Sequence, residues 1–225
     1  MPLPALSASV ESFFDHDEYC AAVLSADPAT KDLEPIVTSA SDKLGKSVSA
    51  RTAARRTLNR ETAVRDFAFT GLASAVDLFE RKARAEFDGG ERAAGYQRLF
   101  PKSPSQLAKT TIEARSQVFD TFVAEAEGEE TPAALAKPVK AVGAAWVGYQ
   151  AAFKRFTAAH AALAKAREKE AAAKHDNITA LRKLDGKLTD RVPDDPKRVR
   201  SYSPPAKAAK KQQPAPAAQA AAKTG

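Results

Sequence analysis

The stretch that decides the fold runs from residue 142 to residue 163 and reads VGAAWVGYQAAFKRFTAAHAAL. Its large apolar side chains recur at alternating steps of four and three residues, which is the spacing of one face of an α-helix. The pattern predicts a helix that packs along this face, in a core or against a partner. We call this set the aromatic seam and take it as the candidate interaction seam. Its members are Val142, Trp146, Tyr149, Phe153, Phe156 and Leu163.

The same register continues toward the C-terminus and predicts a last helical region from about residue 131 to residue 192. His160 occupies the register inside the seam, and we expect it to be a core histidine. Charged residues then hold the register through the stretch 167–174. This stretch is either the exposed end of a bundle helix or a projection that carries an apolar patch to a partner or another copy. The apolar patch consists of Ile178, Leu181 and Leu188.

A second long helix is predicted between residues 38 and 87, where proline is absent and only two glycines occur. Positions spaced by four and three are apolar in the C-terminal half of this stretch, whereas arginines interrupt them in the N-terminal half. The bases between residues 43 and 60 point all around a helix, so they make a poor flat patch, and we expect Arg51, Arg55 and Arg65 to pair with acids across a bundle. Nucleic-acid contact by this basic stretch is the alternative. A break near Gly45 or at residues 60–66 is the alternative to one continuous helix.

Shorter helices are predicted on either side of this long one. Ser7 or Ser9 can cap a helix over residues 7–25, and Asp27-Pro28 ends it. Residues 27–37 are expected to be a linker. A short helical piece over 92–99 precedes a helix over 103–127, where Ser103 and Gln106 form a capping box.

The predicted fold is therefore all-α: an elongated antiparallel helical bundle of about four main helices, two of them long, with coiled-coil-like seams. Residues 1–37 form an acidic N-terminal helix and linker, 38–192 the bundle, and 193–225 a disordered tail. The composition agrees, because Phe, Leu, Val and Ile make up only 42 of the 225 residues, whereas alanine alone numbers 49. So few large apolar residues argue against a barrel, a sandwich or a doubly wound sheet.

Charge is concentrated at the two ends of the sequence. The formal net charge is +7, and no acid follows Asp195, whereas residues 1–37 are strongly acidic. A Lys/Ala/Pro tail without apolar periodicity is expected to contribute nothing to the fold and to contact polyanions through its bases. The candidate polyanion contacts are Lys197, Arg198, Arg200, Lys207, Lys210 and Lys211.

Signals of enzyme chemistry are weak. The sequence lacks a phosphate loop, a dinucleotide fingerprint and a nucleophile elbow, and none of its three histidines follows a glutamate by three residues. Asp15, His16, Asp17 and Glu18 are consecutive, so they do not converge on one metal ion in a helix. We expect Cys20 to be a buried, inert thiol. No catalytic residue, metal or cofactor is predicted.

A single cysteine excludes an intramolecular disulfide and favours a reducing compartment. We expect a cytoplasmic protein without a signal peptide or a membrane span. The leading hypothesis is a non-enzymatic helical scaffolding or interaction protein that associates with itself or binds a partner helix. The alternative is a nucleic-acid-associated protein whose basic tail binds phosphate without reading sequence.

Overall fold

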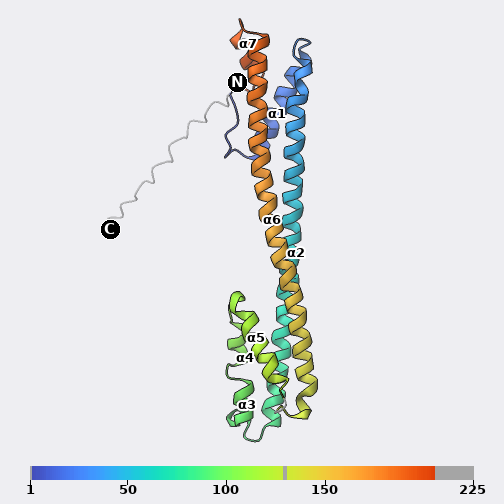
Figure 1. Ribbon diagram of the computed structural model, residues 1–225, viewed down its shortest axis with the longest axis vertical. Helices are drawn as coiled ribbons and strands as arrows, with labels where there is room; N and C mark the ends of the chain where they lie inside the picture. The colour runs from blue at the N-terminus through green and yellow to red at the C-terminus, as the bar shows by residue number, and fades with distance from the viewer. Residues whose placement is uncertain (1, 129–130, 206–225) are drawn as a thin grey trace, which may run out of the picture. The chain divides into compact units, whose positions relative to one another are not determined.

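The computed structural model describes residues 2–128 and 131–205, and every regular element within these ranges is helical (Figure 1). This confirms the all-α prediction. Four helices are longer than the others, and two of these, with 53 and 56 residues, are long, as predicted. The four main helices are α1 Val10–Ala26, α2 Glu34–Glu86, α5 Ile112–Ala126 and α6 Ala136–Arg191. The shorter ones are α3 Ala94–Leu99, α4 Pro104–Ala108 and α7 Pro196–Ser201, with 3₁₀ turns at Lys31–Leu33, Gly90–Arg92 and Ala133–Leu135.

Capping side chains determine where several helices begin. The Ser9 hydroxyl accepts a hydrogen bond from the Ser12 amide at the start of α1, and Ser103 forms the predicted capping box with Gln106 at the start of α4. The predicted single helix over 103–127 is wrong, because Thr111 has an extended backbone and caps a new helix, α5. Helix α2 is continuous and begins at Glu34, inside the predicted linker, because Pro35 is tolerated in a first helical turn.

The chain divides into two compact units, which differ from the predicted segments 1–37, 38–192 and 193–225. Among the described residues, unit 1 contains 2–46 and 171–205, and unit 2 contains 47–128 and 131–170. The long helices α2 and α6 each supply residues to both units.

Unit 2 has a core of aromatic rings. Helices α3 to α5, green in Figure 1, lie beside the C-terminal part of α2 and the N-terminal part of α6. The Phe119 and Trp146 rings stack at 5.3 Å between centroids, and Phe69 lies 5.5 Å from Tyr149. Because Arg51 pairs with Glu170 while Phe69 meets Tyr149, α2 and α6 run antiparallel in this unit.

Unit 1 has an aliphatic core that both ends of the chain build together. The apolar patch of α6, expected to be either an exposed end or a projection, is covered by the chain's own residues from α1, α2 and α7. Val199 and Tyr202 are buried in the same core, so the prediction of a disordered tail over residues 193–225 is wrong for α7 and for Tyr202. Residues 206–225 lie outside the described ranges. The core members are Cys20, Leu24, Leu33, Val37, Leu181, Leu184, Leu188, Val199 and Tyr202.

Candidate interaction surfaces

The aromatic seam is mostly interior surface of unit 2. Val142, Trp146, Tyr149 and Leu163 are buried, whereas Phe153 and Phe156 are half-buried. Most of the seam therefore packs against the chain's own α2 and α5. His160, expected in the core, is exposed.

The polar atoms of this seam have partners within unit 2. The Trp146 indole N–H donates to Asp120 Oδ1 at 2.7 Å, and the Arg115 guanidinium donates to the Tyr149 hydroxyl at 3.0 Å. The Arg115 guanidinium also lies 3.7 Å from the centre of the Phe69 ring, a cation–π distance. Because the polar atoms of the buried Trp146 and Tyr149 side chains are hydrogen-bonded in place, we interpret the seam as a built core.

A second set of positions on α2 faces outward and was not singled out in the sequence. Phe67 is 81% exposed, Leu78 45% and Val64 37%. These side chains share one helical face with two small residues, because the positions 64, 67, 71, 74 and 78 again alternate steps of three and four. We call this face the outer stripe. It consists of Val64, Phe67, Gly71, Ser74 and Leu78.

The three arginines of α2 that were predicted to pair across helices differ in their contacts. Arg51 pairs with Glu170 of α6 at 2.9 Å, which confirms the predicted pairing across helices. Arg65 instead pairs with its neighbour Asp66 at 2.6 Å and lies over the Phe156 ring. Arg55 is exposed, and no ion pair among the described residues includes it.

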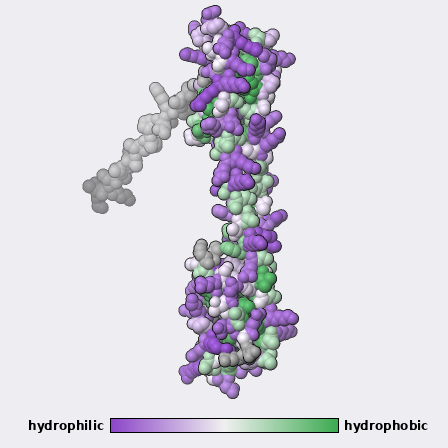
Figure 2. Space-filling view, in the orientation of Figure 1, coloured by the Kyte–Doolittle hydropathy of each residue, from purple (hydrophilic) through white to green (hydrophobic). Residues whose placement is uncertain are grey.

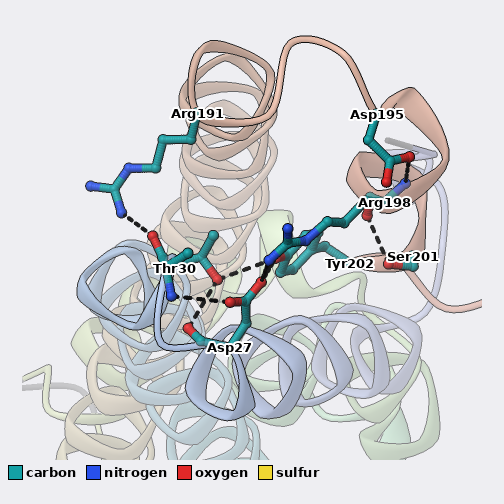
Figure 3. Close-up of polar contacts among 8 residues, drawn as sticks. Asp27, Thr30, Arg191, Asp195, Arg198, Ser201 and Tyr202 are labelled. Carbon is teal, nitrogen blue, oxygen red and sulfur yellow. Dashed lines mark hydrogen bonds and ion pairs between the residues drawn. The ribbon is translucent and has the colours of Figure 1, made fainter.

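A polar latch fastens α7 to the turn that follows α1 (Figure 3). The Tyr202 hydroxyl and the Arg198 guanidinium both donate to Asp27 Oδ2, the latter at 2.5 Å. Thr30 Oγ1 donates to the Tyr202 hydroxyl at 3.3 Å. The hydrogen bonds from Tyr202 and Arg198 lower the pKa of Asp27 to about 2.

A further ion pair and a cap support the latch. Arg191 pairs with Asp32 at 2.5 Å, and the Asp195 carboxylate caps α7 by accepting from the Arg198 amide. The latch therefore engages one of the candidate polyanion contacts, Arg198. Lys197 and Arg200 are exposed, and Lys207, Lys210 and Lys211 lie outside the described residues.

A Val199→Ala variant tests whether α7 is part of the fold. Val199 is buried in the core of unit 1, so the loss of two carbon atoms should lower the free energy of unfolding by about 1–2 kcal/mol. Lys197→Ala, an exposed change in the same helix, should have almost no effect. Urea denaturation followed by far-ultraviolet circular dichroism measures both. Equal stability of the two variants would contradict a contribution of α7 to the fold and would support the predicted disordered tail.

Unit 1 also contains a buried carboxyl group on α1, that of Asp17. Asp17 is 1% exposed, and its Oδ2 accepts a hydrogen bond of 2.6 Å from the Asn177 side-chain amide. Burial raises the pKa of Asp17 to about 6. Burial also raises the pKa of the Cys20 thiol to about 12, so this thiol is buried as predicted and poorly suited to act as a nucleophile.

The described residues contain no group of three or more His, Cys, Asp or Glu side chains placed to hold a metal ion. Within the same ranges, no helix has both the length and the apolar character that a membrane crossing requires. The chain matches no known protein-family model, no curated protein and no solved structure. The function proposed below therefore rests on the surfaces of the chain itself.

Proposed function

We propose that this protein is a non-enzymatic helical scaffolding protein that associates with a second copy of itself through the outer stripe of α2. The observation that supports this proposal is the exposure of Phe67, at 81%, on a face that also carries Val64 and Leu78. Burying one phenylalanine side chain contributes roughly 1.5–3 kcal/mol, and a twofold interface would bury two. The aromatic seam, most of which the chain already covers, contributes the rigidity of the unit that presents this stripe.

The stripe is complementary to itself in shape. Gly71 lies at its middle, with open space where a side chain would stand, and Ser74 is the next member. If two copies of α2 cross in antiparallel orientation near Gly71, each Phe67 ring faces the small residues of the other helix, as a knob faces a hole. A twofold arrangement of this kind closes after two copies and leaves no stripe exposed.

The charges of α2 favour the antiparallel orientation. Residues 47–60 carry four arginines and no acid, whereas residues 61–86 carry five acids and four bases. A parallel pair would place the four arginines of one helix beside those of the other, and like charges at such distances repel. An antiparallel pair that crosses near Gly71 keeps the two groups of arginines apart, because residues 47–60 of each helix then lie opposite positions 82 and beyond of its partner.

The mass of the protein in solution tests the proposal. Sedimentation equilibrium over a dilution series should show a dimer for the wild-type chain and a monomer for Phe67→Ser. Val147→Ser is the matched control, because Val147 is 64% exposed on α6 outside the stripe, and it should leave the dimer intact. Circular dichroism confirms that both variants remain helical. A monomeric wild-type chain, or a dimer that persists in Phe67→Ser, would contradict self-association through this face.

A further inference from the structure

Positive charge gathers on one stretch of unit 2, where α2 and α6 form a pair. Residues 47–66 of α2 and 154–170 of α6 together hold ten bases and four acids, an excess of six positive charges over 37 residues. We call these two stretches the basic helix pair. Its bases are Arg51, Arg55, Arg56, Arg60, Arg65, Lys154, Arg155, Lys165, Arg167 and Lys169, and its acids are Glu61, Asp66, Glu168 and Glu170.

This charge is local to the pair. Residues 67–153, which complete unit 2, hold ten bases and eleven acids and are therefore close to neutral. Within the basic helix pair, internal contacts engage three of the four acids: Glu61 pairs with Arg60 and Arg155, Asp66 with Arg65, and Glu170 with Arg51. The acids thus mostly neutralise arginines that already have structural roles.

Six bases remain at the surface of the pair. All six side chains are exposed, and no ion pair among the described residues holds any of them. Figure 2 shows this part of the chain as purple, hydrophilic side chains separated by pale surface. The six bases are Arg55, Arg56, Lys154, Lys165, Arg167 and Lys169.

We infer that the basic helix pair binds double-stranded nucleic acid through its phosphates, without reading sequence. Twenty helical residues extend about 30 Å, at 1.5 Å per residue. A duplex of about nine base pairs has the same length, at 3.4 Å per pair. Lys154, Lys165 and Lys169 are exposed and share one face of α6, so they can follow one run of the phosphate backbone. Arginine suits this role because its planar guanidinium binds phosphate oxygens in a bidentate manner.

Two other polyanionic partners fit the surface less well. An anionic membrane is bound by helices that also insert a face of large apolar side chains. The exposed apolar residues of the basic helix pair are alanines, apart from Val64 at its end, so such a face is lacking among the described residues. An acidic protein partner lacks the regular line of charges that a duplex supplies, and it serves below as an outcome of the test.

In this proposal the folded helices bind nucleic acid in place of the C-terminal tail, and the binding does not require self-association of the chain. The experiment uses the full chain and a fluorescent 20-base-pair DNA duplex of arbitrary sequence, followed by fluorescence anisotropy. With three to six phosphate contacts, the association constant should fall about 40-fold to about 10³-fold between 50 and 200 mM salt. A second duplex of unrelated sequence should bind equally well, because phosphate contacts carry no base information.

A charge-reversal variant identifies the surface. The change of Arg55, Arg56, Lys165 and Lys169 to glutamate should reduce the log–log salt slope by about 1.8–3.6, at 0.9 for each of two to four lost phosphate contacts. The matched control reverses four exposed bases elsewhere in unit 2 and has the same net charge, so it should keep most of the wild-type slope. Its positions are Lys82, Arg92, Lys137 and Lys140. Circular dichroism verifies that both variants retain the helical content of the wild-type chain.

Several results would overturn the inference. One is a wild-type chain that does not bind the duplex at 50 mM salt, and another is a charge-reversal variant whose slope equals that of the control. A chain lacking residues 206–225 should still bind; loss of binding in that chain, with retention in the charge-reversal variant, would assign binding to the tail. Polyglutamate that competes as strongly as the duplex would indicate an acidic protein partner instead.

Discussion

Replacement of Phe79 by alanine is expected to lower the free energy of unfolding of unit 2 by about 3–5 kcal/mol, the usual cost of removing a fully buried aromatic ring. Phe79 is completely buried, and its ring lies 5.3 Å from that of Phe100 and 6.1 Å from that of Phe122. The ring therefore joins α2 to α5 and to the segment that follows α3. Alanine would leave a cavity where these elements meet.

The single tryptophan of the chain makes this measurement specific to unit 2. Trp146 stacks on Phe119 in the same core, so urea denaturation followed by its fluorescence reports the unfolding of this unit. Val147→Ala, an exposed change on the next residue, should alter the free energy of unfolding by less than about 0.5 kcal/mol. A loss below about 1 kcal/mol for Phe79→Ala would show that the aromatic core is loosely packed in solution.

The second large effect concerns the pH dependence of unit 1. The pKa of Asp17 is raised from its ordinary value of 3.8 to about 6 by burial, so between these pH values the folded chain holds a proton that the unfolded chain releases. The stability of unit 1 should therefore fall as the pH rises from about 4 to about 6, by roughly 3 kcal/mol at 1.36 kcal/mol per pKa unit. Above that window the buried carboxylate is ionised, with the Asn177 amide as its donor at 2.6 Å.

The Asp17→Asn substitution removes the ionisable carboxyl group and should abolish the decline in the stability of unit 1 with rising pH. Near pH 7 the variant should be more stable than the wild-type chain by up to roughly 3 kcal/mol, and near pH 4 the two should be similar. His16, whose pKa burial lowers, is present in both chains, so its opposite contribution cancels in the difference. Urea denaturation by circular dichroism at several pH values measures the difference, with Asp15→Asn, an exposed change in α1, as the control. A wild-type profile that rises steadily from pH 4 to 7, with no gain in Asp17→Asn, would contradict the assignment.

Helical periodicity alone predicted much of the fold, because an apolar seam that is maintained over many turns is typical of a helix that packs along that face. The seams of α2 and α6 specified both long helices, and the capping box at Ser103 located the start of α4. Boundaries near proline were less predictable. Pro35 falls in the predicted linker and Pro196 in the predicted disordered tail, although each lies in the first turn of a helix, where its missing N–H has no cost.

The candidate surfaces were predicted less well, since they depend on which face each helix turns inward. The aromatic seam was recognised, but the sequence could not show that α2 and α5 cover most of it. The outer stripe follows the same alternation of steps two positions further along than the seam of α2, and only burial by neighbours distinguishes Phe67 from Phe69. The basic helix pair combines residues about a hundred positions apart, so a count along the chain shows the excess charge of the tail and does not show that of the pair.

The way in which the two units divide the sequence affects how the chain folds during its synthesis. Unit 2 is one continuous stretch, whereas unit 1 joins the two ends of the chain, and Thr30 and Tyr202 meet across 172 residues of sequence. Helix α1 therefore leaves the ribosome long before α7 and the last turns of α6 exist. Prior folding of unit 2 brings these distant segments closer and reduces the entropy cost of closing the loop between them. A ribosome stalled after residue 170 with its nascent segment fully emerged would carry a folded unit 2 and an α1 whose C-terminal partners have yet to be synthesised.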